Sequence, residues 1–275
     1  MRQAMSLWIV DLHPARRWAL EREALVDVIR ETGHEAVEAV YNPEDGEVPD
    51  ELRPILASSR PLLLRGSVGF VAWADAHGSP RPGAFRSERL RPSSYLPAYG
   101  DLALNSDAII TTYAGFNAKR AEYEELLGGT LFVKPADGGK LLSGTLLTPG
   151  RSLFDAHYAA HRRWRPVPDD CRLLLGRARP IQAEWRFVIA GDRVAAGSQY
   201  KRGPVLDSRA GAPEGAAALA DVIAKHPWRP ADVFVADVAQ TDAGFRLLEL
   251  NTFGTSGLYA CDLHAVVRAV SPYAP

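Results

Sequence analysis

The stretch FVADVAQTDAGFRLLELN, residues 234–251, decides the fold of this chain more than any other. Two apolar runs, FVADVA and FRLLEL, flank turn-forming residues at Asp242–Gly244, which predicts an antiparallel hairpin. The first run contains Asp237 and the second contains Glu249, and the hairpin would bring these two carboxylates close together. Asn251 lies two residues after Glu249, so both side chains point to the same face of their strand.

Two carboxylates and an amide oxygen on one surface are hard oxygen ligands, which suit Mg²⁺ bound together with nucleotide phosphates. We therefore predict that Asp237, Glu249 and Asn251 hold a magnesium ion. The alternative is a half-buried hairpin whose polar residues face solvent. Unpaired carboxylates among Phe, Val, Leu and Ala neighbours are costly, which weakens that alternative.

A lysine ends a second apolar run, LFVKP, and the glycine-rich segment ADGGKLLSG follows it. Lys134 can reach a phosphate, and Gly138, Gly139 and Lys140 can cover phosphates through backbone N–H groups. The segment is not a Walker A loop, because Leu141 follows Lys140 in place of Ser or Thr. Taken alone, the segment is better explained as a glycine-rich hairpin with a solvated lysine.

Glu184 and Arg186 lie two residues apart in AEWRFVI and so share one face of a predicted strand. Lys201 and Arg202 end the next strand, across a hairpin turn at Gly191, so a cationic surface would face the acid pair. Arginine binds phosphate or carboxylate through two parallel hydrogen bonds. A cross-strand ladder of ion pairs explains this piece equally well. The other face of the strand carries Trp185, Phe187 and Ile189.

The first third of the chain alternates strand and helix patterns, which favours a small parallel sheet with covering helices. Strands are predicted at 7–12, 36–41 and 61–65, with helices at about 14–32 and 51–57. Residues 78–97 are rich in Pro, Gly, Ser and Arg and are predicted to be a long surface connection between domains.

In the last third of the chain the predicted strands follow one another through turns, which predicts a largely antiparallel sheet there. The predicted helices are 118–127, 153–164 and 215–224, and the predicted strands are 130–134, 173–175, 183–189, 193–200, 233–239 and 245–250.

Composition excludes several classes of protein. The chain has 275 residues and a net charge of −1, which gives no basic surface for nucleic acid. Its two cysteines are too few for a disulfide scaffold. No apolar run approaches the roughly 20 residues that span a bilayer, and the N-terminus lacks the pattern of a signal peptide. We expect a cytoplasmic protein that does not bind membranes.

The chain resembles the ATP-grasp family in the order of three motifs. They are Lys134 with the glycine-rich segment after it, Glu184 and Arg186 on one strand, and Asp237 followed by Glu249 and Asn251. In that family two α+β lobes hold ATP between them. RGSVGF at 65–70 and SSYLPAYGDLALNSD at 93–107 are similar to the branch marked by two arginines and a lysine. The resemblance implies a mixed α/β and α+β fold. A small parallel-sheet α/β domain would cover residues 1–95, an N-lobe with the glycine-rich loop 96–172, and a C-lobe with the Mg–ATP site 173–275.

The resemblance also implies a role for each candidate residue. Lys134 would contact the α- and β-phosphates, and Arg186 would stabilise the transferred phosphoryl group. The remaining implied contacts are Gly138, Gly139 and Lys140 over the phosphates, Lys201 or Arg202 in the anionic pocket, Glu184 with the nucleotide, and the backbone of Leu173, Leu174 and Leu175 at the adenine. No acid in LLLGRARPIQ takes the place of the ribose-binding acid of many members.

The activity implied is ligation that uses ATP and Mg²⁺. A substrate carboxylate becomes an acyl-phosphate, and an amine then displaces phosphate to form an amide. The partners would be small-molecule or peptide carboxylates and amines, bound near Arg65, Ser67 and Tyr95. A kinase of the same fold and a non-catalytic nucleotide-binding protein are the alternatives. The sequence carries no signal for the oligomeric state, for which base rates favour a homodimer.

Overall fold

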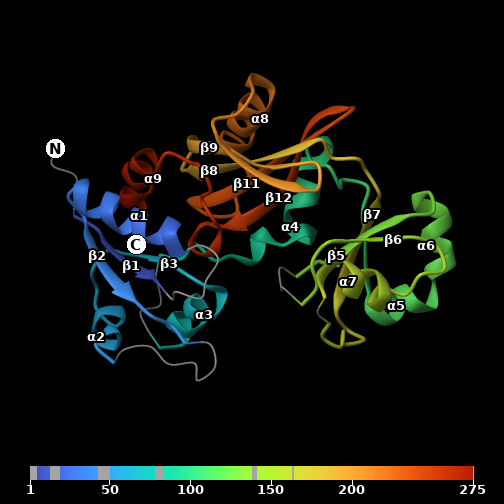
Figure 1. Ribbon diagram of the computed structural model, residues 1–275, viewed down its shortest axis with the longest axis horizontal. Helices are drawn as coiled ribbons and strands as arrows, with labels where there is room; N and C mark the ends of the chain where they lie inside the picture. The colour runs from blue at the N-terminus through green and yellow to red at the C-terminus, as the bar shows by residue number, and fades with distance from the viewer. Residues whose placement is uncertain are drawn as a thin grey trace.

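The residues that the structure describes form three β-sheets with helices packed against them (Figure 1). The computed structural model describes residues 5–12, 19–42, 50–77, 83–137, 141–162 and 164–274. In the view of Figure 1 the N-terminal part lies at the left, a small lobe at the right, and a larger sheet between and above them.

The N-terminal part is a small parallel sheet, as predicted, and its strands lie in the order β2-β1-β3. Its strands are β1 (Leu7–Asp11), β2 (Glu35–Ala39) and β3 (Leu62–Arg65), and its helices are α1 (Ala19–Glu31), α2 (Leu52–Leu56) and α3 (Val68–His77). Gly33 follows α1 with φ of 81° and confirms the predicted helix end, since glycine adopts this conformation without strain. Helix α3 was not predicted, because VGFVAWA is apolar on nearly every side and shows no helical period.

The larger sheet is antiparallel throughout, in the order β10-β9-β8-β11-β12, which confirms the antiparallel sheet expected in the last third of the chain. Its strands are β8 (Ala183–Ala190), β9 (Arg193–Arg202), β10 (Val205–Ala210), β11 (Val233–Thr241) and β12 (Gly244–Thr252). One face, with Trp185 and Phe187, packs on α4 (Pro92–Tyr99) and α8 (Glu214–Ala224). The opposite face, with Val188 and Val235, packs on α1 and α9 (Leu263–Val270).

The small lobe contains the antiparallel sheet β4-β7-β5-β6. Its strands are β4 (Ile109–Thr112), β5 (Leu131–Pro135), β6 (Thr145–Leu147) and β7 (Arg172–Arg177), and its helices are α5 (Tyr113–Ala118), α6 (Arg120–Leu127) and α7 (Leu153–His161). Leu131, Val133, Leu173 and Leu175 pack against these helices. Because β7 pairs with both β4 and β5, the proposed domain division after residue 172 falls inside this sheet.

The predicted surface connection at 78–97 is wrong in its second half, where α4 begins at Pro92. Proline is compatible with the first turn of a helix, since its missing N–H is not needed there. Tyr95, Leu96 and Tyr99 of α4 join the core of the larger sheet. The described ranges also contain four short 3₁₀ helices: η1 (Glu88–Leu90), η2 (Gly100–Leu102), η3 (Phe253–Thr255) and η4 (Ser271–Tyr273).

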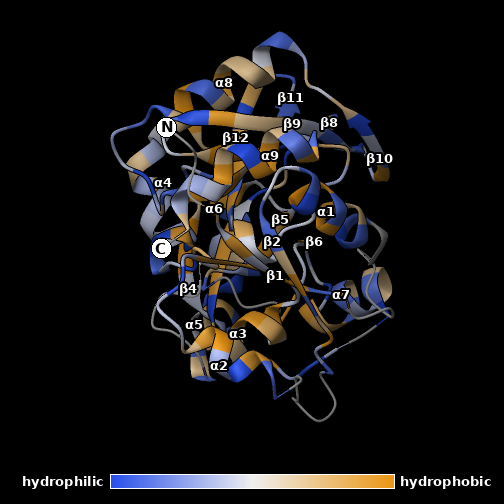
Figure 2. Ribbon diagram, turned by 90° about the vertical axis from the view of Figure 1, so that its left-hand side faces the viewer, coloured by the Kyte–Doolittle hydropathy of each residue, from blue (hydrophilic) through white to orange (hydrophobic). Residues whose placement is uncertain are grey.

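The covering helices carry hydrophobic and hydrophilic residues on the same ribbon, as Figure 2 shows, which is typical of helices packed on a sheet. Within the described ranges no helix has both the length and the apolar character needed to cross a membrane.

Candidate functional site

The candidate site lies on the face of the larger sheet where β8, β11 and β12 run side by side. Asp237 is directly opposite Arg186 of β8 on one side and opposite Glu249 of β12 on the other. Side chains directly opposite each other in an antiparallel sheet share a face. The three side chains therefore form one row across the sheet, and the predicted proximity of Asp237 and Glu249 is confirmed.

A β-bulge is responsible for this row. Near the turn the hairpin pairs Val238 with Leu247, whereas the next pair is Asp237 with Glu249, so Leu248 is the extra residue. If the register near the turn continued, Asp237 would face Leu248, and Glu249 would point to the opposite face. The bulge thus places Glu249 and Asn251 on the same face as Asp237.

Arg186 and Asp237 form a buried, bidentate ion pair. Arg186 Nε donates to Asp237 Oδ1 at 2.8 Å, and Nη2 donates to Oδ2 at 2.7 Å. The Asp237 side chain is 0% exposed and that of Arg186 10%. Arg186 Nη1 also donates to the carbonyl of Gly257 at 3.0 Å, and the guanidinium lies 5.0 Å from the ring centre of Tyr259.

Asn251 joins the two carboxylates. Its Nδ2 lies 3.1 Å from Asp237 Oδ2 and 3.0 Å from Glu249 Oε1. The three predicted metal ligands therefore meet within hydrogen-bonding distance. A turn of the Asn251 amide by half a rotation brings Oδ1 to the same point, which would complete a set of three oxygen donors.

Lys134 reaches the site from the small lobe. It ends β5, and its Nζ donates to Glu249 Oε2 at 3.0 Å across the space between the two lobes. The Lys134 side chain is 15% exposed and that of Glu249 34%. Lys134 thus belongs to the same cluster as the acids, and it is not the solvated lysine of the alternative interpretation.

Burial and partners change the acidity of this cluster in opposite directions. Burial raises the pKa of Asp237 to about 6, although Arg186 and its hydrogen bonds oppose the rise. Burial would also raise the pKa of Glu249, but Lys134 and the Asn251 amide outweigh it and hold that pKa at about 2. Despite its burial, the pKa of Lys134 is raised by Glu249, so Lys134 stays cationic. Glu249 and Lys134 are therefore charged at neutral pH.

Glu184 is held by two neighbours on β9. Tyr200 and Lys201 both donate to its carboxylate, Lys201 at 2.7 Å. Adjacent residues of a regular strand point to opposite faces, but a bulge in β9 lets both contact Glu184. Glu184 and Lys201 thus form the cross-strand ion pair that was the equal alternative, next to the Arg186 row.

Arg202 lies apart from the acid cluster. Its Nε is 3.5 Å from Asp207 of β10, and its side chain is 63% exposed. Its partner in the ladder is Ala183, which packs in the core on the other face of the sheet. The structure therefore does not bring Arg202 into the anionic pocket.

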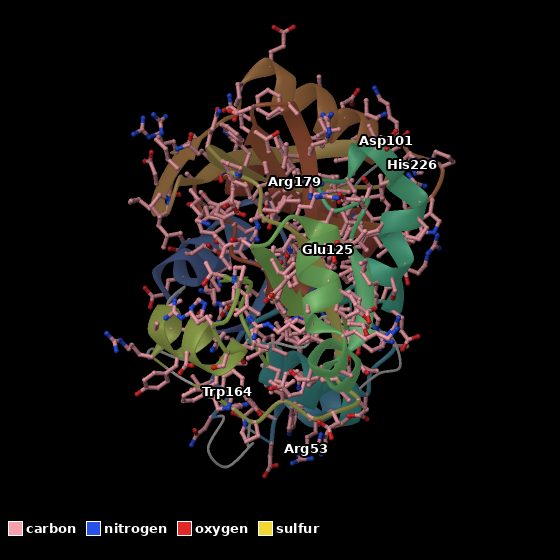
Figure 3. All side chains as sticks on the ribbon, turned by 90° about the vertical axis from the view of Figure 1, so that its right-hand side faces the viewer. Arg53, Asp101, Glu125, Trp164, Arg179 and His226 are labelled. Atoms are coloured by element: carbon pink, nitrogen blue, oxygen red, sulfur yellow. The ribbon has the colours of Figure 1, made fainter. Side chains whose placement is uncertain are left out.

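The expectation for Leu173, Leu174 and Leu175 also requires correction. These residues lie in β7 between β4 and β5, paired on both sides, and their side chains are fully buried. Their backbone groups belong to the sheet ladders and are not placed to contact adenine. Gly138, Gly139 and Lys140 lie outside the described residues. The connection after β7 carries Arg179, which binds Asp107 where the lobes meet (Figure 3).

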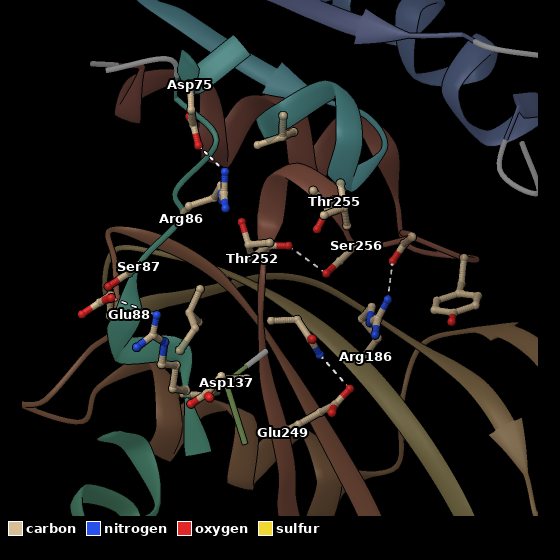
Figure 4. A pocket seen from close by; sticks show the side chains of 18 residues that line it. Asp75, Arg86, Ser87, Glu88, Asp137, Arg186, Glu249, Thr252, Thr255 and Ser256 are labelled. Atoms are coloured by element: carbon tan, nitrogen blue, oxygen red, sulfur yellow. Dashed lines mark hydrogen bonds and ion pairs between the residues drawn. The ribbon is translucent and has the colours of Figure 1, made fainter. Parts of the chain in front are cut away.

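A pocket of about 650 Å³ opens at the cluster (Figure 4). Arg186 and Glu249 lie at one end, and the ion pair of Asp75 with Arg86 lies at the other. Thr255, Ser256 and Gly257 line the wall. The volume is within the range of pockets for small molecules.

The donor set fits magnesium better than a softer metal. In the part of the chain that the structure describes, no three His, Cys, Asp or Glu side chains are grouped so as to hold a metal by themselves. Two carboxylates with one amide oxygen leave coordination positions for phosphate oxygens and water, which is how Mg²⁺ is usually bound.

Tyr259 is a site residue that the sequence reasoning missed. It lines the pocket, stacks on Tyr200 at 4.9 Å between ring centres, and lies against the Arg186 guanidinium. Its contact partners are far away in the sequence, so no local pattern indicated it.

The comparisons with known proteins agree with this geometry. A family model described as the ATP-grasp domain of R2K clade family 3 matches residues 45–270. No curated protein sequence matched.

Solved structures show the same fold over nearly the whole chain. D-cycloserine synthetase DcsG has a TM-score of 0.64 and 14% identity, with 98% of this chain and 99% of that chain covered. D-alanine–D-alanine ligase from Bacillus anthracis has a TM-score of 0.57 and 12% identity, with 98% and 97% covered. N5-carboxyaminoimidazole synthetase from Staphylococcus aureus has a TM-score of 0.60 and 10% identity, with 99% and 78% covered.

Proposed function

Because the chain belongs to the ATP-grasp proteins, in R2K clade family 3, we propose that it is a ligase that uses ATP and Mg²⁺ to join a carboxylate to an amine. One observation carries the proposal. Asp237, Glu249, Asn251, Arg186 and Lys134 come from both lobes and converge at one end of a small-molecule pocket. The structural neighbours named as ligases support the same reaction class.

In this proposal Asp237, Glu249 and Asn251 hold Mg²⁺, which when bound neutralises charge on the phosphate oxygens. Asp237 is fixed by Arg186, and a half rotation of the Asn251 amide, which lies within hydrogen-bonding distance of both acids, would supply the third oxygen. Preorganised charges of this kind are the main contribution of a protein to phosphoryl transfer.

Arg186 and Lys134 keep donors for anionic oxygens. A guanidinium has five N–H donors, and the contacts to Asp237 and Gly257 use three of them. The Lys134 ammonium has three donors, of which Glu249 takes one. Both cations therefore can bind phosphate oxygens of ATP while they retain the acids that orient them.

The reaction would proceed in two steps at this end of the pocket. The substrate carboxylate attacks the γ-phosphorus, ADP leaves, and an acyl-phosphate forms. The neutral amine then attacks the acyl carbon, phosphate leaves, and the nitrogen loses a proton. The cationic side chains stabilise the charge on the phosphoryl oxygens, and the walls hold both substrates in reach, so no protein nucleophile is needed.

Calorimetry with ADP and with a hydrolysis-resistant ATP analogue tests the binding site. We expect binding that requires Mg²⁺ in the wild type and in Glu122→Gln, an exposed control, and weaker binding by at least tenfold in Glu249→Gln. Binding that is indifferent to both Mg²⁺ and Glu249→Gln would overturn the metal assignment.

Product analysis tests the reaction. The protein is incubated with Mg–ATP and mixtures of carboxylates and amines, and ADP, free phosphate and new amides are measured. A ligase yields ADP, free phosphate and the amide in equal amounts. ADP without free phosphate would show that phosphate stays on an acceptor, as in a kinase, and would overturn the ligase proposal.

A further inference from the structure

The segment Phe253–Tyr259, which follows β12, links the candidate site to the N-terminal part of the chain. At its far end it holds Arg186, through the Gly257 carbonyl at 3.0 Å and through the ring of Tyr259. At its start it packs on β3, and the N–H of Gly66, the residue after that strand, donates to the Gly254 carbonyl at 2.8 Å. The position of Arg186 therefore depends on how this segment is held.

Glu21 of α1 holds the same segment through its carboxylate. Its Oε2 accepts hydrogen bonds from the backbone N–H groups of Leu258 at 2.8 Å and Tyr259 at 3.0 Å. The Glu21 side chain is only 10% exposed, so these bonds are protected from water. Two successive N–H groups that meet at one oxygen form an anion-binding turn, and Glu21 supplies the anion.

Arg65 orients Glu21 from β3. Arg65 Nη2 lies 3.3 Å from Glu21 Oε1, and Arg65 Nη1 donates to the Phe253 carbonyl. The Arg65 guanidinium also lies 4.7 Å from the ring centre of Phe253. Both ends of the segment are thus attached to a single ion pair of the N-terminal part.

Tyr259 shows that this attachment imposes a conformation. Its φ is 55°, in the left-handed region that residues other than glycine rarely adopt. Such a conformation persists only where surrounding contacts require it. Here the contacts are the Glu21 carboxylate on the Tyr259 N–H and the stack of its ring on Tyr200.

We propose that Glu21 is a positioning residue that fixes Arg186 for phosphoryl transfer through the Gly257–Tyr259 backbone; this role rests on the proposed function. Without the carboxylate, the Leu258 and Tyr259 N–H groups lose their acceptor, Tyr259 leaves the left-handed region, and the Gly257 carbonyl moves away from Arg186. Arg186 keeps its two bonds to Asp237 and stays folded into the sheet, but it loses the third bond that fixes its orientation.

The first measurement reads the position of Arg186 without any activity assay. The buried Nε–H of Arg186 gives a side-chain signal in a ¹⁵N–¹H spectrum of the full chain, assigned by its loss in Arg186→Lys. We expect Glu21→Ala to shift or broaden this signal. Glu21→Gln keeps an oxygen acceptor and should retain it. Glu31→Ala on the same helix, which removes an exposed pair with His264, should leave it unchanged. An unchanged Arg186 signal in a folded Glu21→Ala protein would overturn the proposal.

The second measurement compares a hydrolysis-resistant ATP analogue with ADP, both with Mg²⁺. Arg186 would act on the γ-phosphate, so Glu21→Ala should weaken binding of the analogue by about tenfold more than binding of ADP. Glu21→Gln should restore most of this extra loss of affinity. Equal weakening of both nucleotides would show a merely structural role and overturn the proposal. If the wild type binds neither nucleotide, the proposed function fails, while the Arg186 signal still decides the role of Glu21.

Discussion

Replacement of Arg186 by Met should destabilise the protein in a pH-dependent way. The change leaves the Asp237 carboxylate 0% exposed, and among the described residues only the Asn251 amide still donates to it. Removal of one partner of a buried ion pair typically costs about 3–5 kcal/mol, because the remaining charge is neither solvated nor paired. We expect a loss of this size in the free energy of unfolding at pH 7.5, measured by urea denaturation.

The sign of the pH dependence follows from Asp237. Burial already raises its pKa to about 6 with Arg186 present, and loss of Arg186 raises it further. The folded variant then binds a proton that the unfolded chain does not, so its stability falls as pH rises. As pH falls, the loss of unfolding free energy in Arg186→Met should therefore shrink by about 1.4 kcal/mol for each pH unit over which Asp237 takes up its proton.

Two control variants test whether the loss comes from the buried charge. Arg30→Met removes an exposed pair with Glu38 and should cost less than about 1 kcal/mol. Arg186→Met combined with Asp237→Asn removes the buried charge and should recover most of the lost stability. A loss below about 1 kcal/mol for Arg186→Met, or the same loss at pH 5 and pH 7.5, would refute the reasoning.

Three further predictions concern the neighbours of this pair. Because the pKa of Asp237 is about 6, protons should compete below that pH with the Mg²⁺ that we propose it holds, and the Mg²⁺-dependent part of ADP binding should weaken about tenfold per pH unit; a flat calorimetric profile from pH 5 to 8 would contradict this. Lys134→Met removes the proposed phosphate donor and should weaken binding of an ATP analogue at least tenfold in calorimetry, whereas Lys119→Met, at an exposed pair, should not; equal effects would argue against the role of Lys134. Tyr200→Phe removes one of two donors to the buried Glu184 and should lower the free energy of unfolding by about 1–3 kcal/mol in urea, and no loss would show that this bond is not needed.

Much of the site was predictable because its residues lie on strands with clear patterns. Alternation of apolar and polar residues placed Trp185 and Phe187 on one face and Arg186 on the other, and the sheet confirms both. The turn at Asp242–Gly244 and the acids on either side of it predicted the hairpin of β11 and β12. Strand periodicity is a local property of the sequence, so it can be recognised without any knowledge of the rest of the fold.

The parts that were missed depend on contacts between distant segments. Leu173–Leu175 were identified as a strand, but only the observed partners β4 and β5 show that both of its edges are occupied. Helix α4 contains Pro97 and follows a run of turn-forming residues, and it is stabilised by burial of Tyr95, Leu96 and Tyr99 in another segment's core. Tertiary packing of this kind overrides local propensity.

The bulge at Leu248 decides whether an odd or an even spacing between Asp237 and Glu249 places both carboxylates on one face. A hairpin without it needs one residue fewer between Asp237 and Glu249 to place both carboxylates on one face. A search for the three ligands by a fixed spacing would therefore pass over chains that lack the bulge, and would accept hairpins in which the same spacing points the glutamate away. Deletion of Leu248 keeps Glu249 opposite Asp237, whereas deletion of Gln240 and Leu248 together turns Glu249 to the opposite face of the sheet. The first deletion should therefore be better tolerated than the second. The bulge, more than the identity of the acids, sets which spacings between them are compatible with a metal site.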